Sequence, residues 1–196
     1  MTDPQELAGA LRVILQAFER LAVTWAIGGS VASSAHGEPR STNDVDVIAV
    51  LSESEARAFV ALLGADFYAD ADVAADAARR RSSFNIIDTR GFIKIDVFVP
   101  PSGPLGTGQL ERRVVLEIFP GLQLPILGPE DVILQKLRWH ALGGGVSERQ
   151  WRDVVGVLRL GAERIDHAYL DQVAASEGLT DGLRRAREDA TDSPSP

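Results

Sequence analysis

The feature that most constrains the fold is a glycine pair followed by a serine, Gly28-Gly29-Ser30, between a short apolar run and a short helical pattern. The run 23–27 is typical of a strand, and 30–36 is typical of a helix with Ser30 near its N-cap. Glycines at such a turn let backbone amides approach a ligand closely, and the helix N-terminus directs its partial positive charge to the same place. A lone Gly-Gly-Ser is also an ordinary capped turn, so this feature needs support from the rest of the chain.

The next apolar run, 44–50, begins with two aspartates one residue apart, Asp44 and Asp46. Side chains alternate between the two faces of a strand, so both carboxylates are expected on the same side. Two carboxylates at that spacing repel each other unless a cation lies between them. The alternative is a strand end with two solvated acids, in which Asn43 and Asp44 form a turn.

A third aspartate, Asp96, interrupts the run 92–99, which otherwise suits the interior of a sheet. An unpaired buried carboxylate is costly, so Asp96 needs a partner. That partner is either a lysine or arginine, or a metal ion shared with Asp44 and Asp46. The order of strand, glycine turn, helix, Asp-x-Asp strand and Asp-bearing strand is more specific than any one of its parts.

Three carboxylates in this arrangement suit phosphoryl chemistry with divalent ions. Mg²⁺ (or Mn²⁺) prefers carboxylate and phosphate oxygens, and two such ions can activate a hydroxyl and stabilise a departing pyrophosphate. We expect Asp44 and Asp46 to bridge both ions, and Asp96 to bind the catalytic ion and help deprotonate the acceptor. Gly29 and Ser30 would hold the β and γ phosphates of a nucleoside triphosphate. Nucleotidyl transfer is therefore the leading hypothesis.

The hydrophobic periodicity predicts an α/β (α+β) fold, with a small mixed β-sheet flanked by helices and a C-terminal helical portion. Apolar residues recur every three or four positions over 4–21, and Ser52 with Glu55 forms a capping-box pattern that opens a helix ending near Gly64. Further helices are predicted at 73–81, 129–142, 147–158, 166–176 and 179–188, and further strands at 83–88, 92–99, 113–119 and 122–127.

Two local features predict how these elements are joined. Thr89-Arg90-Gly91 separates two strand patterns, which indicates a hairpin with Gly91 in the left-handed conformation. The shift in composition at Gly128-Pro129 is the one domain boundary that the sequence indicates. We therefore expect an α/β core at 1–128, a helical portion at 129–190 and a disordered tail at 191–196.

Composition excludes several classes of protein. The chain has no cysteine, which excludes disulfides, zinc–thiolate sites and cysteine nucleophiles, and His36, His140 and His167 lack metal-ligand spacing. The net charge of −8 argues against broad binding to a nucleic-acid backbone, although it leaves room for a local basic groove. No apolar run approaches the ~20 residues that span a bilayer and no signal peptide is visible, so we expect a cytoplasmic protein without a membrane partner.

The glycine turn, Asp44-Val45-Asp46 and Asp96 together resemble the signature of the nucleotidyltransferase superfamily of the DNA polymerase beta fold. The segment 40–46, read as Arg-x-Thr-x-Asp-x-Asp, is similar to the branch that includes the abortive-infection toxin nucleotidyltransferases. The resemblance covers roughly 23–155. It implies an NTP substrate, a two-metal mechanism, and a nucleotide-binding role for Gly28, Arg40 and Thr42 beside Gly29 and Ser30.

The same branch carries a helix with a lysine and a helix with a basic-x-x-Arg-Asp pattern, and 129–137 and 149–153 resemble them. The resemblance implies that Lys136 contacts the triphosphate and that Arg149 or Arg152 lines the site. Without it, Lys136 is an ordinary solvated helix residue. Arg149 and Asp153 are then an i,i+4 ion pair, worth a few tenths of a kcal/mol.

Several functional alternatives remain open at this point. The acceptor is an RNA end, a protein side chain or a small molecule, and the enzyme is accordingly toxin-type, regulatory or drug-modifying. A second class is a non-catalytic nucleotide-binding module on the same fold, although such a module would tolerate the loss of one acid. A third class is an antitoxin or partner subunit of a toxin–antitoxin-like module, which would form a stable complex with a cognate partner chain.

Overall fold

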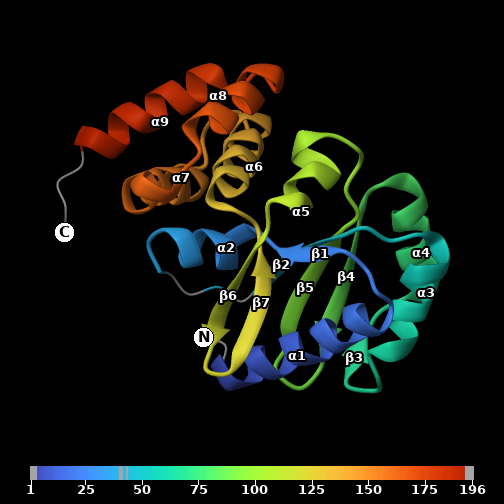
Figure 1. Ribbon diagram of the computed structural model, residues 1–196. Coiled ribbons are helices and arrows are strands. Elements are labelled where there is room, and N and C mark those ends of the chain that lie inside the picture. Colours follow the sequence, from blue (N-terminus) through green and yellow to red (C-terminus); the bar gives the residue numbers. More distant parts are fainter. Residues whose placement is uncertain (1–3, 40–41, 43, 193–196) are drawn as a thin grey trace. The chain divides into compact units, whose positions relative to one another are not determined.

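The computed structural model describes residues 4–39, 42 and 44–192 (Figure 1). Its residues form two compact units, and each consists of segments that are separate in the sequence. The first unit falls within 1–28 and 41–126, and the second within 29–40 and 127–196.

The first unit contains a mixed sheet in the strand order β3-β4-β5-β2-β1-β7-β6 (Figure 1). The strands are β1 (Trp25–Ile27), β2 (Asp44–Ala49), β3 (Phe67–Tyr68), β4 (Ser83–Asp88), β5 (Ile93–Phe98), β6 (Val114–Phe119) and β7 (Leu122–Ile126). The pairs β2–β5 and β1–β7 are parallel, and the other pairs are antiparallel. The predicted mixed sheet flanked by helices is confirmed, although the two-residue β3 was too short to be recognised.

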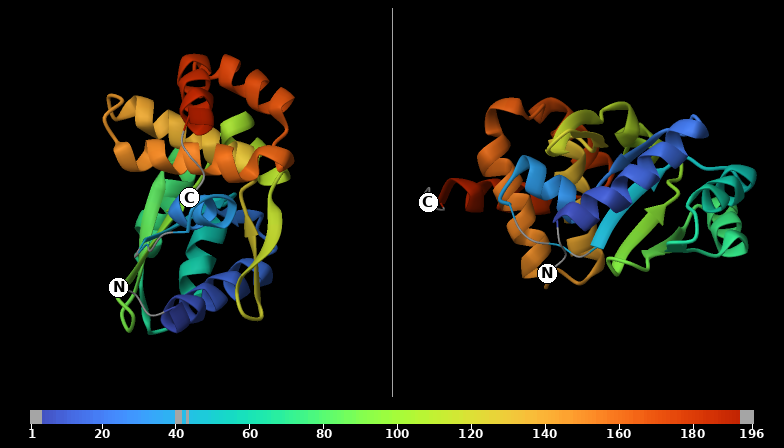
Figure 2. Two further views of the ribbon diagram at one scale, coloured as in Figure 1. Left: turned by 90° about the vertical axis from the view of Figure 1, so that its left-hand side faces the viewer. Right: turned by 90° about the horizontal axis from the view of Figure 1, so that it is seen from below.

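Helices and aromatic side chains build the core of the first unit. Its helices are α1 (Pro4–Arg20), α3 (Glu53–Leu62), α4 (Ala71–Arg80), the π-helical turn η1 (Pro104–Gly108) and α5 (Gln109–Glu111). Phe18 of α1 stacks on Phe59 of α3 with ring centroids 4.3 Å apart, and Phe59 meets Phe84 of β4 edge-on at 6.4 Å. The two helices therefore lie on the same face of the sheet (Figure 2).

The predicted capping box at the start of α3 is confirmed. The amide of Glu55 donates to Ser52 Oγ at 3.2 Å, and the amide of Ser52 donates to Glu55 Oε2 at 2.8 Å. The hydroxyl of Ser52 also donates to Glu55 Oε2 at 2.6 Å, and this bond, with the one from the Ser52 amide, lowers the pKa of the Glu55 carboxyl below its usual value. The cap fixes where α3 begins, directly after the strand that carries Asp44 and Asp46.

The hairpin between β4 and β5 forms as predicted, but the prediction for its glycine was wrong. Phe92 has the positive φ of 51°, whereas Gly91 is absent from the described positions with positive φ. A Cβ atom on Gly91 would lie 3.0 Å from Ile93 Cδ1 and 3.3 Å from Glu6 Cβ. Lack of space, rather than backbone conformation, therefore favours glycine at this position.

The second unit is helical. It contains α2 (Gly29–His36), α6 (Pro129–Leu142), α7 (Glu148–Gly161), the 3₁₀ turn η2 (Ala162–Arg164), α8 (His167–Ser176) and α9 (Thr180–Asp192). α2 packs against α6 and α7, α6 packs against α7 and α8, and α7 packs against α9. None of the helices in the described residues combines the length and apolar character needed to cross a membrane.

The second unit differs from the helical portion expected at 129–190 in two respects. α2 belongs to it, because Val31, Ala32, Ser33 and His36 of this helix are buried and the helix packs on α6 and α7. α9 also continues to Asp192, so it includes the first two residues of the predicted tail. The remainder of that tail lies outside the described residues.

Candidate active site

The three aspartates lie at matching positions of two adjacent parallel strands of the first unit. In the β2–β5 pair, Asp46 is the register partner of Asp96, and Asp44 is the partner of Lys94. Register partners point to the same face of a sheet, as do residues two apart in one strand. Asp44, Asp46 and Asp96 therefore share one face, with Lys94 beside them.

The pairing of β5 with β4 shows on which face of the sheet the three acids lie. Phe84 of the aromatic core pairs with Val97, whereas its neighbour Asn85 pairs with Asp96. The acids consequently lie on the face opposite to the core formed with α1 and α3. Asn85 extends the row of polar side chains across β4, and it was not among the predicted site residues.

Lys94 supplies the partner that the sequence required for Asp96. Its Nζ donates a hydrogen bond to Asp96 Oδ2 at 2.8 Å, with 46% of the Lys94 side chain and 17% of the Asp96 side chain exposed. Asp96 raises the pKa of Lys94 through this bond and its charge, and the charges of Asp44 and Asp46 raise it further. Lys94 was missed in the sequence, although the spacing of two residues from Asp96 places both on one face.

The chemistry of this cluster suits a divalent cation. Carboxylate oxygens are the ligands that Mg²⁺ prefers, and the charges of all three acids act on the one ammonium group. Among the described residues, no three Asp, Glu, His or Cys side chains are arranged to hold a metal ion. The three aspartates thus provide suitable oxygen ligands, and the Lys94 ammonium lies beside them.

The glycine turn connects β1 to the start of α2. The amide of Gly28 donates to the backbone carbonyl of Asp46 at 2.9 Å, so the N–H of Gly28 is engaged within the first unit. Gly29 has a φ of 55°, which glycine adopts without a steric penalty. Ser30, half-buried, follows in the first turn of α2 and accepts a hydrogen bond from Ser33 Oγ at its carbonyl. Gly29 and Ser30 belong to the second unit.

The remaining residues of the predicted nucleotide site before β2 are Arg40 and Thr42. The hydroxyl of Thr42 donates to the carbonyl of Asp44 at 3.0 Å and accepts from its amide at 3.3 Å. Thr42 therefore orders the backbone at the first aspartate of β2. Arg40 lies outside the described residues.

Lys136 is buried in the second unit rather than solvated. Its Nζ donates to Asp153 Oδ2 at 2.7 Å, and both side chains are only 7% exposed. This ion pair joins α6 to α7. Arg149 is exposed near the start of α7.

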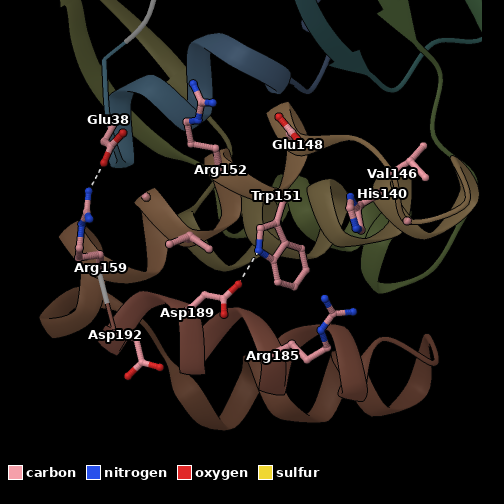
Figure 3. A pocket seen from close by; sticks show the side chains of 13 residues that line it. Glu38, His140, Val146, Glu148, Trp151, Arg152, Arg159, Arg185, Asp189 and Asp192 are labelled. Atoms are coloured by element: carbon pink, nitrogen blue, oxygen red, sulfur yellow. Dashed lines mark hydrogen bonds and ion pairs between the residues drawn. The ribbon is translucent and has the colours of Figure 1, made fainter. Parts of the chain in front are cut away.

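Arg152 lines an open pocket of about 600 Å³ within the second unit (Figure 3). Trp151 forms a wall of this pocket, with the His140 ring 5.1 Å from its centroid and Arg185 5.2 Å over its face. The indole N–H donates to Asp189 at 2.8 Å, which fixes the ring. The pocket thus combines an aromatic wall with guanidinium and carboxylate groups.

Solved structures of several proteins share this architecture. The chain is similar to the antibiotic-resistance factor ANT(2'')-Ia over 95% of its length and 100% of that chain, at 15% identity and a TM-score of 0.58. It is similar to an antigenic nucleotidyltransferase-like protein from Paracoccidioides brasiliensis over 95% of each chain, at 18% identity and a TM-score of 0.55. A lincosamide antibiotic adenylyltransferase, LnuA, matches 78% of this chain over 96% of its own, at 15% identity and a TM-score of 0.50.

These likenesses show that the chain has the nucleotidyltransferase fold, as the sequence resemblance implied. No family model matches the sequence, and no curated protein matches it. The resemblance to the abortive-infection branch stays a prediction.

Proposed function

We propose that this protein is a metal-dependent nucleotidyltransferase that moves a nucleoside monophosphate from an NTP to an acceptor hydroxyl. One observation carries the proposal: the register of β2 and β5 sets Asp46 beside Asp96 and puts Asp44 on the same face. Val45, Val47 and Val97, which alternate with the acids, are buried on the opposite face, so the carboxylates contribute nothing to that core. Phosphoryl transfer depends mostly on positioning and charge neutralisation, which this row of carboxylates supplies once cations are bound.

We propose a role for each of these residues. Asp44 and Asp46 would hold two Mg²⁺ or Mn²⁺ ions, and Asp96 would hold one of them and accept the proton of the attacking hydroxyl. When bound, the ions neutralise phosphate charge and lower the pKa of a coordinated hydroxyl. Gly29 and Ser30 would orient the triphosphate, since a helix N-terminus favours phosphate groups.

Residues around the three acids are proposed to support this function. Thr42 orders the backbone of Asp44 through two hydrogen bonds, and we infer that it positions this carboxylate. Arg40 and Arg152 are proposed to neutralise phosphate charge. The resemblance implies that Lys136 contacts the triphosphate and that Arg149 or Arg152 lines the site.

We infer that the acceptor is the hydroxyl of a small molecule. Two proteins of the same fold are an antibiotic-resistance factor and a lincosamide antibiotic adenylyltransferase, and the first matches nearly the whole chain. The net charge of −8 also disfavours a nucleic-acid acceptor. An RNA or protein acceptor would instead support the toxin-type role, with a cognate antitoxin as the expected partner chain.

The alternative is a non-catalytic nucleotide-binding module or partner subunit. The Lys94–Asp96 ion pair is the observation that favours it, because it gives Asp96 a partner without any metal ion. The two hypotheses differ in one measurable respect: only the enzyme transfers label from an NTP to an acceptor.

The test uses each of the four α-³²P-labelled NTPs with Mg²⁺ or Mn²⁺ and a cell extract divided into RNA, protein and small-molecule fractions. We expect label in the small-molecule fraction, and we expect Asp46→Ala to lower the rate by ~10²–10³ while the fold survives. Asp181→Ala is the matched control, because this aspartate is 95% exposed in α9, outside the proposed site. NTP binding without transfer in any fraction would instead identify a binding module.

A further inference from the structure

A lysine ammonium lies among the carboxylates proposed to bind metal. Lys94 Nζ is 2.8 Å from Asp96 Oδ2, and Lys94 is the register partner of Asp44. The chain has 20 basic residues, of which only Lys94 and Lys136 are lysines. Arginine is the more common basic residue of this chain, but position 94 carries a lysine. The lysine ammonium is compact, whereas an arginine guanidinium is broad and planar.

The position of this ammonium conflicts with metal binding by Asp96. A divalent ion bound to Asp96 Oδ2 and an ammonium donating to the same oxygen would be close enough to repel strongly. Nearly half of the Lys94 side chain is exposed, so its long, flexible stem can carry the ammonium into solvent. Asp96 is only 17% exposed and its backbone is fixed in the sheet, so the lysine is the partner that moves.

We propose that Lys94 is a positioning residue that competes with the divalent ion for Asp96. In the metal-free protein its ammonium holds the repelling carboxylates together, and it withdraws from Asp96 when the ion binds. This inference rests on the proposed function, since it concerns the same acids. Lys94 thereby stabilises the metal-free cluster and weakens metal binding. A higher metal concentration is then needed to fill the site.

The first test is a calorimetric titration of the full chain with Mn²⁺. We expect Lys94→Met to bind Mn²⁺ on the order of ten-fold more tightly than the wild type, because the competing charge is gone. Lys94→Arg keeps the charge and should stay within about two-fold of the wild type. The metal-free Lys94→Met protein should also melt at a lower temperature than the wild type, and Mn²⁺ should narrow that difference. Equal affinity of Lys94→Met and wild type would overturn the proposal.

The second test observes the wild-type lysine directly and does not depend on a variant that folds. Protein labelled with ¹³C at the lysine ε-carbon has one signal each from Lys94 and Lys136, and the buried Lys136 serves as an internal reference. Titration with Mg²⁺ should shift the Lys94 signal and leave the Lys136 signal in place. A Lys94 signal that stays fixed while Mg²⁺ binds would contradict the withdrawal of its ammonium.

A third variant separates failure of this inference from failure of the proposed function. If Asp46→Asn abolishes Mn²⁺ binding and Lys94→Met tightens it, the metal site and the role of Lys94 are both supported. If Asp46→Asn abolishes binding but Lys94→Met leaves it unchanged, only the role of Lys94 is wrong. If the wild type does not bind Mn²⁺, or Asp46→Asn binds it equally well, the metal site itself is wrong and the role of Lys94 falls with it.

Discussion

His36 is held as a neutral imidazole inside the second unit. Its Nε2 lies 2.7 Å from the carbonyl oxygen of Leu127, so this nitrogen carries the proton and donates. The other ring nitrogen, Nδ1, is buried without a hydrogen-bond partner among the described residues. Burial lowers the pKa of His36 below 6.5, and the charge of Arg164 acts in the same direction.

This burial predicts a pH-dependent free energy of unfolding. Between the lowered pKa of the folded state and 6.5, the unfolded chain binds a proton that the folded chain does not, so stability rises with pH across this window. We expect the wild type to lose about 1 kcal/mol more than His36→Gln between pH 7.5 and pH 5.5. Urea unfolding at the two pH values measures the difference. Equal losses in both proteins would mean that His36 is protonated in the folded state.

The buried pair of Lys136 and Asp153 allows a structural role to be distinguished from a catalytic one. Removing one partner of a buried ion pair costs about 3–5 kcal/mol, because it leaves a charge without its partner. We therefore expect Lys136→Met to lower the free energy of unfolding by roughly that amount, and Lys136→Met/Asp153→Leu to recover much of it. Chemical denaturation measures both. A Lys136→Met protein of normal stability that has lost only nucleotide affinity would instead support the triphosphate contact implied by the resemblance.

At the scale of elements, the β4–β5 hairpin contains local strain. Phe92 is 83% exposed and has a φ of 51°, a conformation that costs a residue with a side chain roughly 1–2 kcal/mol. Phe92→Gly should accordingly raise the free energy of unfolding by about 1 kcal/mol, since little apolar contact is lost. Gly91→Ala should lower it, because its Cβ would crowd Ile93. Thermal melts of the two variants check these opposite signs, and a stabilised Gly91→Ala would contradict the steric explanation.

On the scale of the whole molecule, the second unit is discontinuous in sequence, and its packing depends on α2. A Cβ on Gly37 would lie 2.9 Å from the Val157 amide nitrogen, so the backbone after α2 approaches α7 closely. A fragment of 127–192 lacks this helix and exposes the surfaces of α6 and α7 that it covers. We expect that fragment to unfold without a cooperative transition, as followed by circular dichroism. A cooperative melt would instead support an independent domain beginning near Gly128-Pro129.

The elements themselves could be predicted where local chemistry decides them. The capping box of Ser52 and Glu55, the strand that begins at Asp44, and the proline-led α6 all depend on neighbours within a few residues. The two-residue β3 was missed, since it is a strand only through its pairing with β4. The positive φ was predicted at Gly91 but lies at Phe92, and Ile93 and Glu6 limit the space at Gly91.

The sequence by itself determined the acid-bearing strands, because alternation in a strand fixes which side chains share a face. Only the tertiary structure decided the register that sets Asp46 beside Asp96, and with it the place of Lys94 among the acids. It also decided that Lys136 pairs with Asp153 and that α2 packs with α6 and α7. The physical reason is the same in each case: these contacts join residues far apart in the chain, and burial and charge complementarity select them only once the elements are assembled.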